Sequence, residues 1–554
     1  MLSGLARTFS LLKETANEAA VPVLVAALDS SDLAIQEEAV QAILGRRKGA
    51  GQRVLIERWP QLPERWKLHI ARHPRQISSA VRSAILGTEP ELCVSGCDAL
   101  LYLRDYELIP TLVAGVERPN QPQLALVGHT LLSLCEILEE ELSGPRDMGR
   151  HNETALFVAA ALPSLERAVE RFELHRCRDA VESFLLLASS DNTTLQRLLA
   201  DPRHPAYLVV LDVLCKSLRM PIIRLVLNLL EVPQAPSAVI QVVAHRTDTT
   251  FLRSLLKRIG YELSDTLRAH LKRVESLPCL TQSLAVLDTL AEKDEVAAVL
   301  LATGSNLNRI EAFRVVQYLM TRGRTEARRL ASRALAEFGG AEANQLALHG
   351  LRDPDPQVQA NVTLQLRDRG IPGAITQLIR LLDSPHQDVR LAAQESLTEF
   401  NFNRYITMFD LMDEKIRAST GLLVMRVDPK AATELAGELK SRTRTRRLRG
   451  LEAAVAMDAV DQVEPMVIDL LSDTDHFVRA EAARTLGCCN TPLAYQALQT
   501  VLHDRSAAVR ESAEQALNKL TAEGRMTAAL SITSALDGVE SSPLLTSPSD
   551  TPVS

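Results

Sequence analysis

A repeat of about 31 residues, running from roughly residue 320 to residue 520, constrains the fold more than any other feature of this sequence. Each unit has a leucine-rich stretch that ends near an aspartate, a short polar turn, and an alanine-rich stretch. Apolar residues at three- and four-residue spacing predict two amphipathic helices per unit. One helix pair cannot bury its apolar face alone, so the units must stack on one another. The sequence therefore predicts an all-α fold, an α-solenoid of antiparallel helix pairs.

An apolar anchor near the start of each second helix sets the period. The intervals from Val358 to Val389 and from Val478 to Val509 are both 31 residues. Val389 and Val478 are 89 residues apart, and two further anchors between them divide this distance into steps of 27, 32 and 30 residues. The seven predicted anchors are Ala327, Val358, Val389, Ile416, Leu448, Val478 and Val509. Arginine follows six of them and Gln359 the other, while Asp355 and Asp475 lie three residues ahead of their anchors and can cap the second helix.

This pattern resembles the HEAT repeat family, in particular its short HEAT-like (phycobilisome-lyase-like) repeats. In that family a turn aspartate and an arginine early in the second helix pair into a ladder along the stack. The resemblance implies this role for Asp353, Asp383, Asp473 and Asp504 with Arg390, Arg479 and Arg510. The pattern recurs at residues 21–44, where Ile35 takes the anchor place and Gln36 stands in for arginine.

The rest of the chain departs from this period. Residues 50–305 keep helical periodicity without a clear repeat, as degenerate repeats of the same solenoid or as a separate helical domain. We expect an N-terminal solenoid of degenerate repeats at 1–305, regular repeats at 306–521, and a largely disordered tail rich in Ser, Thr and Pro at 522–554. The polar stretch 143–154 is expected to form a long loop.

Composition narrows the functional class. Aromatic residues make up only 4% of the chain and the net charge is −7, whereas a protein dedicated to nucleic acid is more often strongly basic. Eight cysteines in 554 residues are too few for a disulfide framework and favour a reducing, cytoplasmic setting. Charged residues interrupt the most apolar region, 207–232, so we expect no membrane span.

A run of six cations in ten residues is the candidate site. It contains no acidic residue and could bind phosphates or an acidic partner. The alternative is a solvated turn whose charge is offset by neighbouring acidic repeats. The run consists of Lys440, Arg442, Arg444, Arg446, Arg447 and Arg449. A second arginine-rich stretch at 309–333 includes acids and is weaker evidence.

Other chemical signals are weak. His69 and His73 have the spacing of two ligands on one helix face, but no third ligand is evident, and Cys93 and Cys97 lack paired CxxC spacing. Trp59 and Trp66, the only tryptophans, could form an exposed patch or simply pack around an irregular loop. No nucleotide-binding or nucleophile-elbow motif is present. We therefore expect no catalytic residue, no metal and no cofactor.

These observations favour a non-catalytic scaffold or adaptor that binds protein partners. One alternative is engagement of nucleic acid, as by the alkyl-purine DNA glycosylases built from HEAT-like repeats. Those enzymes are basic and use aromatic-rich clefts, unlike this chain. The other alternative is a role like that of the phycobilisome lyases, which attach or remove bilins, and it rests on fold analogy alone.

Overall fold

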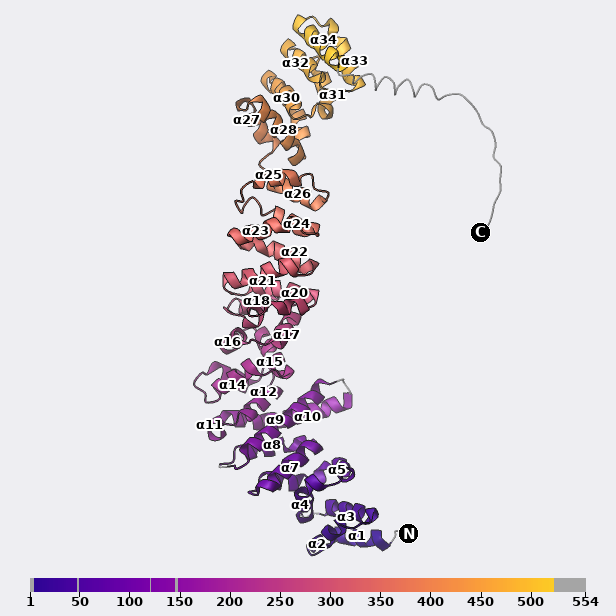
Figure 1. Cartoon of the computed structure of the whole chain (residues 1–554), viewed down its shortest axis with the longest axis vertical. Coiled ribbons are helices and arrows are strands. Elements are labelled where there is room, and N and C mark those ends of the chain that lie inside the picture. The colour runs from indigo at the N-terminus through magenta and orange to yellow at the C-terminus, as the bar shows by residue number, and fades with distance from the viewer. Residues whose placement is uncertain (1–3, 47–48, 120, 145–147, 523–554) are drawn as a thin grey trace, which may run out of the picture. The chain divides into compact units, whose positions relative to one another are not determined.

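The computed structural model describes residues 4–46, 49–119, 121–144 and 148–522, and every regular element in these ranges is a helix (Figure 1). The chain divides into two compact units, Met1–Ala331 and Ser332–Ser554. Within each unit, helices that follow one another in sequence pack as pairs, and successive pairs stack. The predicted all-α solenoid is confirmed. The domain boundaries expected from the sequence stay a prediction.

In the first unit the helices pair from the start of the chain. The pairs include α2 with α3, α6 with α7 and α8 with α9, and helices two apart then form the layers of the stack. The helices are α1 (Gly4–Glu14), α2 (Ala20–Leu28), α3 (Leu33–Gly45), α4 (Ala50–Glu57), α5 (Glu64–Ala71), α6 (Ser78–Ile85), α7 (Pro90–Leu103), α8 (Ile109–Val116), α9 (Leu124–Ser143), α10 (Met148–Glu170), α11 (Phe172–His175), α12 (Arg178–Leu187), α13 (Thr193–Ala200), α14 (Tyr207–Lys216), α15 (Met220–Glu231), α16 (Ser237–His245), α17 (Thr249–Ile259), α18 (Asp265–Leu271), α19 (Pro278–Thr281), α20 (Glu292–Gly304) and α21 (Arg309–Arg322).

The second unit continues with the same architecture. Helix α22 (Thr325–Ala334) spans the boundary between the units. The helices beyond it are α23 (Ala341–Gly350), α24 (Pro356–Thr363), α25 (Ala374–Leu381), α26 (Gln387–Ser396), α27 (Phe402–Met408), α28 (Glu414–Val427), α29 (Ala431–Leu439), α30 (Arg444–Ala456), α31 (Val460–Leu470), α32 (His476–Leu486), α33 (Pro492–Thr500) and α34 (Ala507–Ala522). The second helices α24, α26, α28, α30, α32 and α34 contact one another in turn and form one layer, and α27, α29, α31 and α33 form the other.

Helix α17 shows how the local sequence makes one of these elements. Asp248 caps it by accepting a hydrogen bond of 2.7 Å from the backbone N–H of Phe251, and it ends at Gly260, whose φ of +64° favours glycine. The stripe of buried side chains is Phe251, Leu252, Leu255, Leu256 and Ile259. Each such side chain contributes roughly 1.5–3 kcal/mol on burial, so the stripe fixes the face that packs on α20 and α15.

Arginines that follow helix C-termini tie the repeats of the first unit together. Arg46, Arg246 and Arg324 each donate to groups that lie 29–34 residues earlier in the chain. Arg246 is fully buried, and its guanidinium donates to the carbonyls of Leu214 and Ser217. This reach equals the length of one repeat, although the local sequence shows no period. It supports the interpretation of residues 50–305 as degenerate repeats of one solenoid.

Five of the seven predicted anchors are fully buried: Ala327, Val358, Val389, Val478 and Val509. The two anchors that filled the long gap differ, because Ile416 is 48% exposed and Leu448 is only half-buried. The predicted caps are correct. Asp355 accepts from the backbone N–H groups of Gln357 and Val358, and Asp475 accepts from that of Phe477.

The residue after the anchor closes the turn of its own repeat. In six repeats its side chain donates to the carbonyl of the residue six places earlier. The donor–acceptor pairs are Gln36–Ser30, Gln359–Asp353, Arg390–Ser384, Arg447–Ser441, Arg479–Asp473 and Arg510–Asp504. Glutamine therefore replaces arginine in this role. In the fifth unit the donor is Arg447, whereas the sequence predicted Arg449. The anchor position therefore falls on Arg446, and the predicted anchor Leu448 lies two residues too late.

The aspartate–arginine ladder forms over part of the stack. Arg479 makes two bonds to the Asp504 carboxylate, of 2.9 and 3.0 Å, and Arg447 lies 2.7 Å from that of Asp473. No carboxylate in the described part of the chain is within ion-pair distance of Arg390 or Arg510, and Asp383 pairs instead with Arg426. The ladder implied by the resemblance is thus continuous only across the last repeats.

Two expectations about irregular segments have different outcomes. The long loop expected at residues 143–154 is wrong for 148–154, because α10 begins at Met148. Asn152 and Thr154 are weak helix formers, but α10 packs on α8 and α12, and this packing extends the helix back into the polar region. The disordered tail lies outside the described residues except for its first residue, Ala522, which ends α34. None of the helices in the described ranges combines the length and the apolar character needed to cross a bilayer.

Candidate functional site

The six-cation run occupies the turn between α29 and α30 and the first turns of α30. Lys440 caps the end of α29, and Thr443 is the N-cap residue of α30. Because the turn joins two packed helices, acidic residues from the preceding helix and the neighbouring repeats approach it. The sequence window that defined the run did not contain these carboxylates.

Four of the six cations pair with carboxylates. Arg446 binds the buried Glu438 through two contacts of 3.1 Å and a shorter one, and this bonding lowers the pKa of Glu438. Arg449 is more loosely placed, 3.6 Å from Glu438 and 3.8 Å from Asp410. Arg447 pairs with Asp473, as described above. The charge that singled out the run is therefore largely compensated inside the fold.

Arg444 makes a different contact. Its guanidinium lies 3.2 Å from the Asp475 carboxylate and stacks over the ring of Phe477, 4.6 Å from the centroid. The backbone N–H of Phe477, followed by the charge of Arg444, lowers the pKa of Asp475. Phe477 is 52% exposed and its ring also contacts that of His476, at 4.1 Å between centroids. An aromatic ring thus stays accessible at the start of α32.

Lys440 and Arg442 remain exposed and have no ion-pair partner within the described ranges. They adjoin Arg444 because Arg447 binds the carbonyls of Ser441 and Arg442 while pairing with Asp473 of the next turn. We name this region the turn-edge surface, and it consists of Lys440, Arg442, Arg444, His476 and Phe477. It combines an exposed aromatic ring, a stacked arginine and two uncompensated cations.

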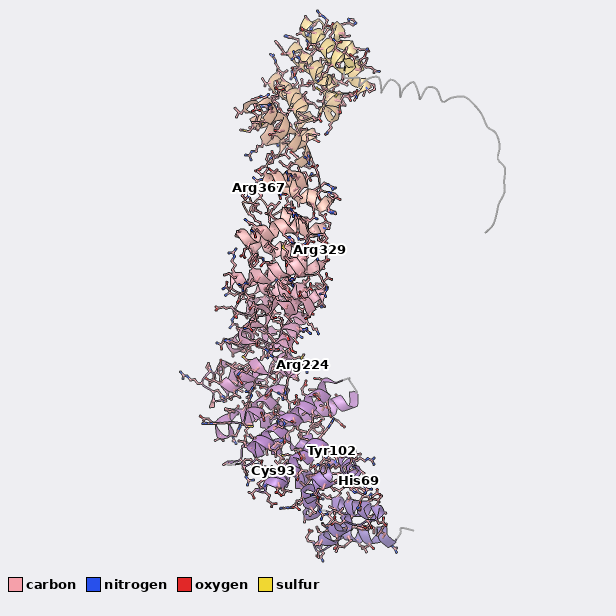
Figure 2. The ribbon with its side chains drawn as sticks, viewed as in Figure 1. His69, Cys93, Tyr102, Arg224, Arg329 and Arg367 are labelled. Atoms are coloured by element: carbon pink, nitrogen blue, oxygen red, sulfur yellow. The ribbon has the colours of Figure 1, made fainter. Side chains whose placement is uncertain are left out.

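The other sequence candidates are structural. His69, which Figure 2 labels, is half-buried and His73 is exposed, and no group of three or more potential metal ligands occurs in the described part of the chain. All eight cysteines are free thiols, and burial raises the pKa of Cys135 and of Cys279 to about 12. Trp59 and Trp66 are buried, and Trp59 packs edge-on against Tyr102 at 5.8 Å. The packing interpretation of the tryptophans is correct.

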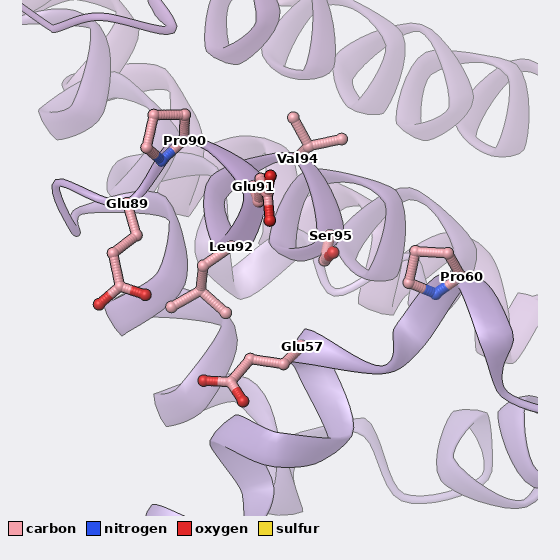
Figure 3. Close-up of a pocket in the computed structure, with 8 residues that line it drawn as sticks. All are labelled: Glu57, Pro60, Glu89, Pro90, Glu91, Leu92, Val94 and Ser95. Carbon is pink, nitrogen blue, oxygen red and sulfur yellow. The ribbon is translucent and has the colours of Figure 1, made fainter.

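A pocket of about 870 Å³ opens in the first unit, between the end of α4 and the start of α7 (Figure 3). Its walls carry three carboxylates, two of which share hydrogen bonds from one arginine. Arg53 bonds Glu57 at 2.8 Å and both oxygens of Glu89, at 2.6 and 2.7 Å. Arg53 offsets one of the three negative charges, and Glu91 has no ion-pair partner among the described residues, so the lining stays acidic and offers no arrangement that would select a particular ligand.

A smaller pocket, of about 370 Å³, lies between α27 and α28 in the second unit. Its walls are aromatic, aliphatic and thioether groups with a polar rim. The sequence analysis did not single out this site. The signals that could have found it are the irregular step of 27 residues to Ile416 and the four aromatic residues between 400 and 409.

Comparison with known proteins identifies part of this architecture. The family model for HEAT repeats matches residues 314–398 and 431–518, and the unmatched gap between them contains α27, α28 and the exposed Ile416. No curated protein matches the chain.

Solved structures similar to the chain include three with broad coverage. An engineered protein is 16% identical, covering 90% of this chain and 98% of its own, with a TM-score of 0.17. A structure from a study of a phosphorylation switch between cadherin and beta-catenin is 15% identical, covering 90% and 98%, with a TM-score of 0.33. A Kap95:Nup1 complex is 12% identical, covering 93% and 82%, with a TM-score of 0.24.

The family match coincides with the buried anchors, the capped turns and the turn-closing side chains described above. Residues 314–398 and 431–518 are therefore HEAT repeats.

Proposed function

We propose that this chain is a non-catalytic cytoplasmic scaffold that binds protein partners, and that the turn-edge surface is one of its binding sites. The observation that carries the proposal is the half-exposed ring of Phe477 with Arg444 stacked on it. The few residues that dominate binding at protein interfaces are enriched in arginine and in large aromatic side chains. Since Arg444 is held by both Phe477 and Asp475, it loses less freedom when a partner binds.

The charges of this surface favour an acidic partner. Lys440 and Arg442 provide two cations that no described carboxylate compensates. Such exposed cations steer the approach of an acidic surface and select against a basic one. The other arginines of the run are occupied within the fold, which leaves less charge for nucleic acid than the sequence suggests.

The test is affinity capture from native lysate with the intact chain, the Phe477→Ala variant and a Lys440→Glu/Arg442→Glu double variant, each with and without nuclease. We expect specific proteins to be retained by the intact chain, reduced roughly tenfold by either variant, and unaffected by nuclease. Leu391→Ala is the matched control, since Leu391 is equally exposed, at 52%, on the second helix of another repeat.

Three outcomes would count against the proposal. Recovery of nucleic acid without specific proteins would favour the nucleic-acid alternative, and bilin retention would favour a lyase-like role. Unchanged recovery by both variants would remove the turn-edge surface from the interface. All substituted side chains are exposed or half-exposed, so the variants should keep the free energy of unfolding within about 0.5 kcal/mol of the parent.

A further inference from the structure

The segment between the two HEAT matches, residues 399–430, is built differently from the repeats around it. Its first helix, α27, and the residues directly before and after it carry an aromatic cluster in a chain that is only 4% aromatic. The cluster consists of Phe400, Phe402, Tyr405 and Phe409. The anchor expected in its second helix, Ile416, faces solvent. The segment therefore departs from the family pattern in both of its helices.

Phe400 and Tyr405 of the aromatic cluster line the pocket between α27 and α28, and Phe409 holds Tyr405 in place. Tyr405 and Phe409 pack edge to face, at 5.5 Å between centroids, and the Tyr405 hydroxyl donates to the carbonyl of Arg417 at 2.9 Å. The Arg417 guanidinium in turn stacks on Phe409 at 4.4 Å. Since Tyr405 is both buried and hydrogen-bonded, the wall does not need to rearrange when a ligand enters.

The remaining lining suits an apolar side chain. The walls include Phe400, Met412 and Val424, and Met408 stands at the mouth with 45% of its surface exposed. Methionine side chains are flexible and polarisable and adapt to different apolar ligands. A volume of about 370 Å³ is at the small end of ligand pockets, which fits one large side chain with its neighbouring backbone rather than a cofactor.

The rim of the pocket has one uncompensated charge, and that charge is positive. The two charged residues of the lining are Glu399 and Arg404. Glu399 forms an ion pair with Arg367 of the preceding repeat, which is labelled in Figure 2. Arg404 is exposed, and its guanidinium has no partner among the described residues. The amide of Asn401 is already committed to the backbone of Thr398 and Arg404.

We infer that this pocket binds a peptide segment of a partner protein that inserts one large apolar side chain and places a carboxylate on Arg404. The apolar walls bury the side chain, and the free guanidinium selects an acidic neighbour over a basic one. This inference rests on the proposed scaffold function, but the site is separate from the turn-edge surface, so either site can fail without the other.

The experiment measures fluorescence anisotropy of a short labelled peptide with a central Leu-Phe pair flanked by Glu and Asp, titrated with the full chain. A second peptide carries Lys in place of the acids. We expect saturable binding of the acidic peptide and weak binding of the basic one. Met408→Asp should lower the affinity at least roughly tenfold, and Arg404→Glu should reverse the preference between the two peptides.

Matched controls separate this site from the other surfaces. Arg442→Glu removes a cation from the turn-edge surface and should leave peptide binding unchanged, and Leu391→Asp places the same new charge on an exposed apolar position of another repeat. Failure of the intact chain to bind the acidic peptide would overturn the inference, as would equal binding by Arg404→Glu. Loss of binding only with Arg442→Glu would assign the peptide to the turn-edge surface instead. Unchanged melting curves for Met408→Asp exclude unfolding as the cause.

Discussion

Arginines hold the first unit and the last repeats of the second unit together in two different ways. In the first unit Arg46, Arg246 and Arg324 reach back 29–34 residues to backbone carbonyls of the preceding repeat, and Arg324 also binds the Glu295 carboxylate. In the last repeats Arg479 closes its own turn through a carbonyl six residues earlier and reaches forward to Asp504 of the next repeat. A hydrogen bond to a backbone carbonyl can form whatever side chain the acceptor residue carries, whereas the bond to Asp504 requires an acidic side chain at that position.

This difference explains why the repeat is visible in one region and hidden in the other. Turn closure needs a donor at a fixed distance from its own turn, so arginine or glutamine recurs at that position in six units. An arginine that bonds the preceding repeat needs only the free carbonyls at the end of a helix in that repeat, and many different sequences provide them. The regular pattern therefore marks how a repeat is closed, and its absence in residues 50–305 does not mark an absence of stacking.

The largest effect should come from Arg246→Ala. The side chain is fully buried, donates to two carbonyls of the preceding repeat and pairs with Asp248 at 2.9 Å. Its loss leaves these acceptors unsatisfied and should cost about 3–5 kcal/mol. Hydrogen exchange should show faster opening in α14 and α16. Arg246→Lys should restore little stability, because a single ammonium group cannot donate to both carbonyls as the planar guanidinium does. Hydrogen-exchange protection equal to that of the parent would show that this contact contributes no stability.

The Arg479–Asp504 pair should show a smaller, measurable coupling. A double-mutant cycle with Arg479→Ala and Asp504→Ala should give an interaction free energy of about 0.5–3 kcal/mol from urea unfolding, because both partners are largely buried and bidentate. Arg510→Ala, which breaks only a turn bond, provides the comparison. A coupling near zero would mean that the ladder does not join the repeats.

The same pair should respond to pH. The hydrogen bond from Arg479 lowers the pKa of Asp504 below its usual value of 3.8. The stabilisation is therefore fully present above the unfolded-state pKa and is lost as the pH falls through the lowered folded-state pKa. The stability difference between the parent and Arg479→Ala should shrink over that acidic range and stay constant from about pH 5 to 8. A difference that grows on acidification would contradict this assignment.

Turn closure at Gln359 should give the smallest effect. Gln359→Leu removes one hydrogen bond of 2.7 Å to the Asp353 carbonyl and should cost roughly 1 kcal/mol in urea unfolding. Gln359→Arg retains a donor of sufficient reach and should be nearly neutral. If Gln359→Arg were as unstable as Gln359→Leu, a side-chain donor at this position would not be sufficient to stabilise the turn.

The sequence was sufficient to predict the stacked helix pairs, five buried anchors and the caps Asp355 and Asp475, because these depend on residues within one turn. It could not show how much charge of the six-cation run is compensated, because the compensating carboxylates come from other elements. Asp473 lies 26 residues beyond Arg447, and Glu438 belongs to the preceding helix. The sequence analysis also missed the pocket of α27 and α28, because it treated the short step of 27 residues to Ile416 as an ordinary repeat.

Turn closure by a repeat's own side chain also has an evolutionary consequence. A unit that satisfies its turn internally needs little from its neighbours beyond a compatible apolar face, so it can be duplicated, deleted or exchanged as a cassette. A unit secured by Arg246 depends on the helix ends of its predecessor and cannot be moved without it. In the last repeats Arg447 and Arg479 also pair with an aspartate of the next repeat, so a unit inserted there must supply that aspartate as well.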